Sequence, residues 1–363
     1  MCGIVGFSGN KNATPILINS LKKLEYRGYD SAGIAVFENE KIRVEKSKGR
    51  LSDLEARLGK VGEPTGTCGI GHTRWATHGE PSDINSHPHS TARIAIVHNG
   101  IIENYKALKQ FLTEQGRTFQ SETDSEVIVQ LLDYYYCGCL PVDESDFEYG
   151  KIPLGVECGN PVSAIVNTLK ELEGSFALGI FFADFPDTIF AVRRESPLIV
   201  GVGDDASYIA SDVPAILQYT KDYYLLEPNE IAVLSPFSTN IYDMHYKKLS
   251  KELKTADFDM EAAEKQGFAH FMLKEIYEQP TAIKTTIAPH IEKGLPYFED
   301  MDFSSYKKIF IVACGSAYYA GVVGKYVIEK VAKIPVEVDI ASEFRYREPI
   351  VGQGDLVIII SQS

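Results

Sequence analysis

Short runs of alternating hydrophobic and polar positions fill the first two-thirds of this 363-residue chain, with a few amphipathic helices between them. The alternation predicts strands over residues 33–37, 68–72, 93–98, 175–182, 188–192, 198–200 and 207–210. Apolar positions after Thr14, the expected N-cap, and Pro15 predict a first helix. Further helices are expected over 102–115, closed by Gly116, and over 124–136. So many strands with grouped helices favour two sheets packed face to face beneath outer helices.

A different pattern follows a polar stretch that is rich in Lys and Glu, over residues 246–260. Residues 307–313 and 356–360 contain continuous apolar runs, separated by an expected helix that ends near residue 332 and a strand over 336–340. Fully apolar strands that alternate with helices predict a parallel sheet covered on both faces.

These two patterns divide the chain. We expect a first domain over residues 1–245, a linker over 246–260 and a second domain over 261–363. The last apolar run is followed by no helix, so we expect the second domain to be truncated at its C-terminal end and the chain to be a fragment of a longer protein.

Residues 137–161 interrupt the first domain with glycines, prolines and acidic side chains, which predicts an exposed excursion. Its thiols, Cys137, Cys139 and Cys158, are unevenly spaced and form no C-x₂-C pair. A zinc site is therefore disfavoured.

Composition and charge limit the class of protein. The net charge of −14 argues against a nucleic-acid surface, which needs clustered Lys and Arg. No apolar run reaches the roughly 20 residues that span a bilayer, and no secretory signal opens the sequence. The six cysteines are scattered, which favours reduced thiols over a disulfide framework. We therefore expect a soluble, cytoplasmic protein with neither a nucleic-acid nor a membrane partner.

A cysteine follows the initiator methionine directly. If Met1 is removed, Cys2 carries a thiol and a free α-amine on one residue. The thiol is a nucleophile, and the amine, whose ordinary pKa is about 7.7–8.0, can act as its general base. The alternative is that Cys2 is a small buried residue at the start of a strand.

Two clusters later in the sequence could serve such a nucleophile. Arg74 follows a predicted strand, and its planar guanidinium suits a two-point grip on a carboxylate, although a structural ion pair is the alternative. Asn99-Gly100 is a strong turn signal at the end of another strand. Functionally, the Asn amide and the Gly backbone N–H could point two donors at one spot and form an oxyanion hole.

Two further groups of polar residues could contact a ligand. Thr123 and Glu126 have capping-box spacing, which predicts Asp124 in the first turn of a helix. There Asp124 either compensates the helix dipole or binds a substrate ammonium group. Five of the eight histidines fall at positions 72, 78, 87, 89 and 98. No pair of them has i, i+4 spacing with a nearby Glu, so a metal site is disfavoured and we expect none.

Several motifs together resemble the glutaminase domain of class II amidotransferases, whose nucleophile is N-terminal. The matching residues are 2–6, 27–33, 72–79, 98–104 and 121–124. The resemblance implies a four-layer αββα sandwich and glutamine hydrolysis through a γ-glutamyl thioester on Cys2, without a cofactor. It further implies that Arg74, with Thr77 and His78, binds the substrate carboxylate, and that Asp124 binds the substrate ammonium group. Asn99 and Gly100 would form the oxyanion hole. Trp75 would gate the passage of ammonia, and Arg27 would lie near the thiol.

The second part resembles the sugar isomerase (SIS) domain of aminotransferases that make glucosamine 6-phosphate from glutamine and fructose 6-phosphate in hexosamine biosynthesis. The matching residues are 271–280, 313–316, 341–347 and 361–363. Ser316 and Ser361 lie just after the ends of predicted strands, where hydroxyls and helix N–H groups can bind a sugar phosphate. Gln362 and Ser363 follow Ser361 and are expected to belong to the same site. Simple capping is the alternative for these serines.

The chain departs from the family pattern in two ways. Ala317 stands where the family usually has a phosphate-binding hydroxyl, and the second sugar isomerase half is absent. The longer parent, expected to be a homodimer, would therefore make glucosamine 6-phosphate, while this fragment would at most hydrolyse glutamine. Two alternatives are an amidotransferase with another acceptor, such as a phosphoribosyl compound, and a non-catalytic module that binds sugar phosphates.

Overall fold

The computed structural model describes residues 2–76, 79–137, 159–256, 268, 270–292, 295–296 and 305–361. The chain divides into two compact units, Met1–Glu264 and Lys265–Ser363. Each unit is described by itself below.

The first unit is built on a large antiparallel sheet with the order β15-β11-β9-β10-β1-β4-β2-β3. Its strands are β1 (Gly3–Gly9), β2 (Ser31–Glu38), β3 (Lys41–Lys48), β4 (Cys68–Arg74), β9 (Ile199–Val202), β10 (Ala206–Ala210), β11 (Asp222–Leu225) and β15 (Lys254–Thr255). The N-terminal strand β1 pairs with β10 on one side and β4 on the other. Residues Gly3–Gly9 therefore lie in the middle of a sheet.

A second antiparallel sheet has the order β14-β13-β12-β8-β7-β6-β5. Its strands are β5 (His89–Ser90), β6 (Ile94–Ile102), β7 (Gly174–Phe182), β8 (Ile189–Arg194), β12 (Ile231–Ser235), β13 (Ser238–Tyr242) and β14 (Lys248–Leu249). The expected linker over residues 246–260 overlaps β14 and β15, which pair with β13 and β11. β14 and β15 are thus edge strands of the two sheets of this unit.

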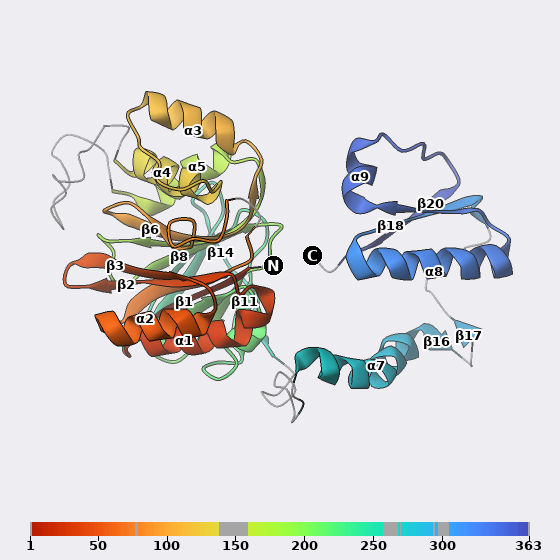
Figure 1. Ribbon diagram of the computed structural model, residues 1–363, viewed down its shortest axis with the longest axis horizontal. Helices are drawn as coiled ribbons and strands as arrows, with labels where there is room; N and C mark the ends of the chain where they lie inside the picture. The colour runs from red at the N-terminus through yellow and green to blue at the C-terminus, as the bar shows by residue number, and fades with distance from the viewer. Residues whose placement is uncertain are drawn as a thin grey trace. The chain divides into compact units, whose positions relative to one another are not determined.

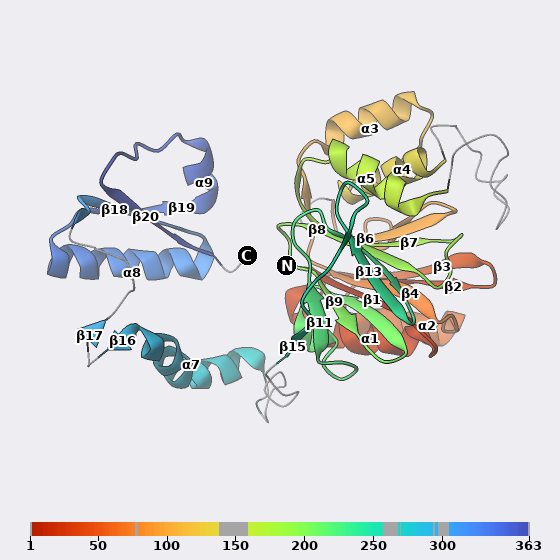
Figure 2. The same ribbon diagram turned by 180° about the vertical axis from the view of Figure 1, so that it is seen from behind.

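Helices cover the outer face of each sheet, so the unit has four layers, as Figures 1 and 2 show. The helices are α1 (Ala13–Leu24), α2 (Leu51–Val61), α3 (Tyr105–Glu114), α4 (Ser125–Tyr136) and α5 (Pro161–Glu171), with 3₁₀ turns η1 (Glu25–Arg27) and η3 (Val213–Ala215). The predicted αββα sandwich is confirmed.

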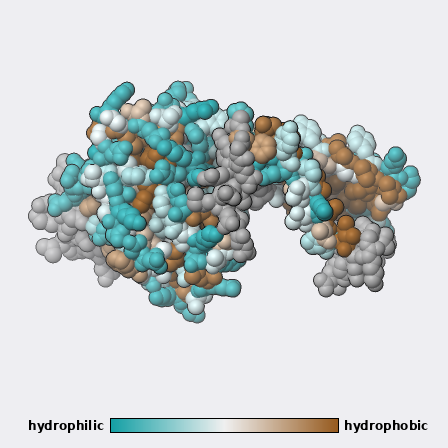
Figure 3. Space-filling view, turned by 90° about the horizontal axis from the view of Figure 1, so that it is seen from below, coloured by the Kyte–Doolittle hydropathy of each residue, from teal (hydrophilic) through white to brown (hydrophobic). Residues whose placement is uncertain are grey.

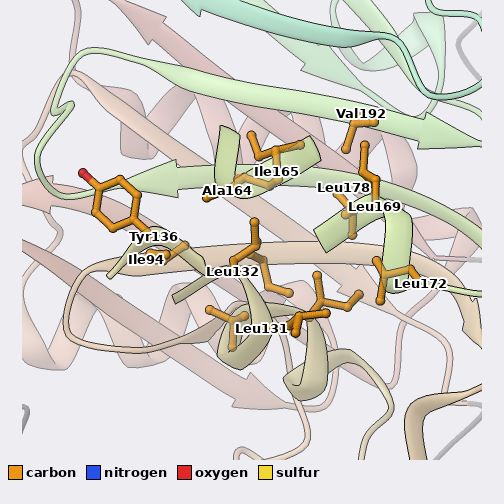
Figure 4. Close-up of a cluster of buried hydrophobic side chains, with 14 of the residues drawn as sticks. Ile94, Leu131, Leu132, Tyr136, Ala164, Ile165, Leu169, Leu172, Leu178 and Val192 are labelled. Carbon is orange, nitrogen blue, oxygen red and sulfur yellow. The ribbon is translucent and has the colours of Figure 1, made fainter. Parts of the chain in front are cut away.

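Three buried hydrophobic clusters fill the spaces between these layers. One joins α1 and α2 to the first sheet, one lies between the sheets, and one joins α3, α4 and α5 to the second sheet. Figure 4 shows the last, in which Leu132 of α4 and Ile165 and Leu169 of α5 lie near Leu178 on β7. Burial of this apolar surface is the main force that stabilises the sandwich.

The structure corrects three local predictions. Asn12, and not Thr14, caps α1, because its side chain accepts a hydrogen bond from the Thr14 N–H at 3.1 Å. Asn99-Gly100 forms no turn: β6 continues to Ile102, with Gly100 opposite Phe176 on β7. The helix predicted over 102–115 accordingly begins at Tyr105, although Gly116 ends it with a positive φ as expected.

The predicted capping box at the start of α4 is also wrong. Glu126 accepts hydrogen bonds from the backbone N–H groups of Gln120 and Ser121 at 2.8 and 2.6 Å, and so fixes the preceding loop instead. Of the expected excursion over 137–161, residues 138–158, with Cys139 and Cys158, lie outside the described residues. Cys137 is buried at the end of α4, and Pro161 begins α5.

The second unit has a parallel sheet with the order β19-β18-β20, as predicted. Its described elements are α7 (Phe271–Ile287), η4 (Ala288–His290), β16 (Ile291–Glu292), β17 (Leu295–Pro296), β18 (Lys308–Ala313), α8 (Gly315–Ala332), β19 (Val336–Ile340), α9 (Ala341–Tyr346) and β20 (Asp355–Ile360). Helix α8 lies close against β18, because Gly321 has no side chain to hold it away from Ile311.

Much apolar surface of the second unit stays exposed. Val323, Val327 and Val331 on α8 are exposed, as is Ile359 on β20, and Figure 3 shows hydrophobic side chains gathered on this unit. The expected cover on both faces is therefore incomplete at β20. Within the described part of the chain, no helix combines the length and apolarity needed to cross a membrane.

A buried ion-pair cluster makes the first unit sensitive to one substitution. Asp133 on α4 accepts from Arg93 at 3.1 Å and from Arg117, and its own side chain is almost fully buried. Asp133→Ala removes this carboxylate from two guanidinium groups, so we expect the free energy of unfolding to fall by about 3–5 kcal/mol. Urea denaturation monitored by the fluorescence of Trp75, the single tryptophan, measures the change.

Glu55→Ala is the matched control, because it removes a solvent-exposed pair with Lys22. We expect it to change the free energy of unfolding by less than about 1 kcal/mol. An equally small effect of Asp133→Ala would contradict the assigned importance of the buried cluster.

Candidate active site

Three strands, β1, β4 and β6, bring the candidate residues to one end of the layer between the sheets. Ile4 on β1, Ile70 on β4 and Val97 on β6 belong to the hydrophobic cluster of that layer. Successive side chains of a strand alternate between its faces, so a residue two positions along a strand faces the same layer. Cys2, His72 and Asn99 each lie two positions from one of these residues, in the direction of the site. Arg74 lies two positions beyond His72. The pairing of Gly3 with Thr73 sets Cys2 beside Arg74.

The Cys2 thiol is half-buried and contacts the backbone of Trp75. The Trp75 N–H donates to Sγ at 3.2 Å, and Sγ lies 3.5 Å from the Trp75 carbonyl oxygen. Burial raises the pKa of the Cys2 thiol, while the hydrogen bond from Trp75 opposes that shift by stabilising the thiolate. The Asp30 carboxylate adds to the increase in pKa, and the Arg74 guanidinium opposes it.

Two side chains hold the Cys2 backbone from different elements. Its carbonyl oxygen accepts from Arg27 Nε on η1 and from Asn99 Nδ2 on β6, each at 3.1 Å. Arg27 Nη1 also donates to Asp212 at 3.2 Å, and the Tyr26 hydroxyl donates to the same carboxylate oxygen at 2.5 Å. The structure thus places Arg27 and Asn99 directly at the predicted nucleophile, on its backbone.

Arg74 is the last residue of β4. Its Nη2 donates to the Gly79 carbonyl oxygen at 3.1 Å, and the Asp30 carboxylate accepts from the Ala76 N–H. Thr77 and His78, two predicted substrate contacts, lie outside the described residues.

Asp124 is buried at the N-cap position of α4 and not in its first turn. Its Oδ2 accepts from the backbone N–H of Ile102 at 2.8 Å, which joins the start of α4 to the end of β6. Because β6 also carries Asn99 and Gly100, this bond ties the predicted ammonium partner to the predicted oxyanion hole.

Four of the five clustered histidines come together beneath this end of the sheets. The ring centroids of His72 and His87 lie 4.2 Å apart, and those of His87 and His89 lie 4.7 Å apart. His98 Nδ1 lies 2.8 Å from the Ser125 hydroxyl on α4. Burial is the main cause that lowers the pKa of all four, to about 3 for His72, so the rings are neutral at physiological pH.

The described residues contain no group of three His, Cys, Asp or Glu side chains arranged to hold a metal ion. The described histidine contacts are instead with rings, hydroxyls and amide oxygens. His89 Nε2, for example, lies 3.1 Å from the Thr123 hydroxyl.

Trp75 stands exposed at the rim of this site. Its ring meets that of Tyr29 edge to face, with centroids 5.3 Å apart, and the Arg50 guanidinium lies 5.8 Å from the Tyr29 ring centre. An exposed ring with one aromatic neighbour can change position at small cost in buried surface.

A separate candidate site lies in the second unit. Ser316 is in the first turn of α8, directly after β18, and Ser361 follows β20. Because β18 and β20 are parallel and Ala313 pairs with Ile360, both serines stand at the carboxyl edge of the sheet. Gln362 and Ser363 lie outside the described residues.

Comparisons with known proteins identify a domain type in each unit. Residues 72–218 match the model of a glutamine amidotransferase domain, and residues 302–363 match that of a SIS domain. Over its whole length the chain is 52% identical to the glutamine–fructose-6-phosphate aminotransferase (isomerizing) of Caldanaerobacter subterraneus subsp. tengcongensis and 51% identical to that of Clostridium acetobutylicum. The chain is a homologue of these aminotransferases. It spans 57% of the length of each.

Solved structures show the same fold as this aminotransferase homologue. Glutamine phosphoribosylpyrophosphate amidotransferase from B. subtilis has a TM-score of 0.57 at 20% identity, with 93% of this chain and 65% of that chain covered. A structure described as the allosteric regulatory enzyme of purine biosynthesis gives 0.56 at 21%, with the same coverage. At this level of identity the likeness shows the fold alone.

Several residues of the candidate site were not predicted from the sequence. The period-two alternation could have placed His72 on the same face as Arg74, since both follow Ile70 at even spacing. No local signal indicated Asp212 or Tyr26, because their contact with Arg27 joins segments that are far apart in the sequence.

The environment of Cys2 predicts the pH dependence of its alkylation. Because burial disfavours the thiolate, we expect the thiol of the protein that retains Met1 to react with iodoacetamide with a half-maximal pH above that of a short cysteine peptide. Mass spectrometry of the N-terminal peptide, with Cys2→Ser to confirm its assignment, measures the rate at each pH. A half-maximal pH at or below that of the free peptide would contradict the described environment.

Proposed function

We propose that the amidotransferase domain hydrolyses glutamine to glutamate and ammonia through a γ-glutamyl thioester on Cys2, once Met1 has been removed. The observation that carries this proposal is the position of Asn99, whose amide nitrogen lies 3.1 Å from the Cys2 carbonyl oxygen. An amide donor held on the residue that carries the nucleophile is suited to acyl transfer, which needs a donor near the reacting carbonyl group.

The chemistry follows from the groups present. The α-amine of Cys2 takes the thiol proton as sulfur attacks the side-chain carbonyl carbon of glutamine. The carbonyl oxygen becomes an oxyanion, which the second amide proton of Asn99 and the Gly100 N–H stabilise. The amine then gives its proton to the departing nitrogen, which leaves as ammonia, and water cleaves the thioester to release glutamate.

The remaining residues would hold the substrate at its other end. Arg74 binds the α-carboxylate with help from Thr77 and His78, and Asp124 binds the ammonium group. The exposed ring of Trp75 gates the passage of ammonia away from the thioester.

We further propose that the whole protein transfers this ammonia to fructose 6-phosphate and forms glucosamine 6-phosphate, as a cytoplasmic homodimer with neither a nucleic-acid nor a membrane partner. The match to a SIS domain supports fructose 6-phosphate as the acceptor over a phosphoribosyl compound. In this chain Ser316 and Ser361, with Gln362 and Ser363, would contact the sugar phosphate, while the reaction retained is at most glutamine hydrolysis.

Cys2→Ala should abolish glutamate release, because no other group of the chain is proposed to form the thioester. A coupled glutamate assay on protein whose intact mass shows the loss of Met1 measures this directly. Cys314→Ala, which removes an exposed thiol of the second unit, is the matched control and should retain full glutaminase activity. Undiminished activity of Cys2→Ala would contradict the mechanism.

Ser316→Ala should weaken the binding of fructose 6-phosphate by about tenfold, the loss expected for one hydrogen bond to a charged group. Isothermal titration calorimetry on the chain measures this, with fructose as the control ligand because it lacks the phosphate. Equal affinity of wild type and variant for fructose 6-phosphate would show that Ser316 does not contact the phosphate.

A further inference from the structure

A chain of buried hydrogen bonds runs from one sheet to the other and ends at the nucleophile. The ring of His72 on β4 faces the layer between the sheets, and its Nε2 lies 3.0 Å from the His98 carbonyl oxygen and 3.0 Å from Asn99 Oδ1, both on β6. Asn99 Nδ2 then donates to the Cys2 carbonyl oxygen. Hydrogen bonds thus connect His72 on β4, Asn99 on β6 and Cys2, which directly precedes β1.

The protonation of His72 is fixed by one of these contacts. A backbone carbonyl oxygen can only accept a hydrogen bond, so Nε2 must carry the proton that it shares with His98 O. Burial lowers the pKa of His72 to about 3, so the ring is neutral and its single proton resides on Nε2. The ring therefore offers a donor, and not an acceptor, to the Asn99 side chain.

The orientation of the Asn99 amide follows from that donor. The amide atom that faces His72 Nε2–H must be the oxygen, which turns the nitrogen toward Cys2. If the amide turned over, its nitrogen would face the His72 donor and its oxygen would face the Cys2 carbonyl oxygen. Both contacts would then be repulsive, and an acceptor would stand where the oxyanion forms.

We propose that His72 is a positioning residue, whose Nε2–H holds the Asn99 amide with its nitrogen toward the nucleophile and so sets the polarity of the oxyanion hole. The catalytic consequence rests on the function proposed above, while the orientation itself does not. His72 touches neither substrate nor thiol in this account, and acts only through Asn99.

The surroundings of His72 suit this task. Its ring is almost fully buried and lies against the neutral ring of His87, so few alternative partners can reach it. In a site that excludes water, a hydrogen bond that fixes a neighbouring dipole is stronger than at the surface.

Two substitutions separate the donor from the bulk of the side chain. His72→Leu keeps a similar volume and removes the donor, so we expect kcat for glutamine hydrolysis to fall by about 30- to 100-fold, toward the 10²–10³ typical of a lost oxyanion donor. KM should change by less than about threefold, because the substrate contacts of Arg74 and Asp124 remain. His72→Gln places an amide donor at nearly the same point and should restore kcat to within about fivefold of wild type.

A purely structural role would not give this pattern. Alkylation of Cys2 by iodoacetamide proceeds without an oxyanion, so its rate should be the same in wild type and both variants. His89→Leu is the matched control, since it removes another buried, neutral histidine that contacts Thr123 and not Asn99. We expect His89→Leu to keep kcat within about threefold of wild type.

A second readout needs no activity. With selective ¹⁵N-asparagine labelling, and Asn99→Asp to assign the signal, the Asn99 side-chain protons should exchange slowly in wild type and His72→Gln and rapidly in His72→Leu. If kcat of His72→Leu matches wild type, if His72→Gln is as slow as His72→Leu, or if exchange is unchanged, the inference is wrong. If wild type itself releases no glutamate while the exchange pattern holds, the orientation stands and the proposed function fails.

Discussion

The packing of two antiparallel sheets face to face is the constraint from which the site follows. Each central strand must turn every second side chain into the shared layer, and apolar residues such as Ile4, Ile70 and Val97 fill it. At the end of the layer the same alternation continues, but the residues become Cys2, His72 and Asn99. The site is thus an extension of the hydrophobic core, with polar groups that are positioned by the register of the strands.

Burial then decides the chemistry of those polar groups. Removal from water lowers the pKa of His72 and raises the pKa of the Cys2 thiol. In both cases burial favours the uncharged form of the side chain. Backbone atoms supply the compensation: the His98 carbonyl oxygen accepts from His72, and the Trp75 N–H donates to Cys2 Sγ. In the proposed reaction, the α-amine of a processed N-terminus would act as the base for this thiol.

The sequence predicted the layers better than the contacts. Alternating and continuous apolar runs were sufficient for the αββα sandwich and for the parallel sheet, and the motifs indicated the amidotransferase and SIS domains that family models match. Local signals failed where tertiary pairing prevailed. Asn99-Gly100 reads as a turn, yet pairing with β7 keeps it within a strand, and Glu126 reads as a capping residue, yet it bonds to the preceding loop.

The central claim is that Cys2 becomes covalently acylated by glutamine. Acid quenching of the Met1-processed chain during turnover, followed by peptide mass spectrometry, tests it most directly. The account predicts a glutamyl group on the N-terminal peptide, carried by Cys2 and absent when glutamine is omitted. A glutamyl group on another residue, or turnover with no modified peptide under conditions that trap thioesters, would contradict it.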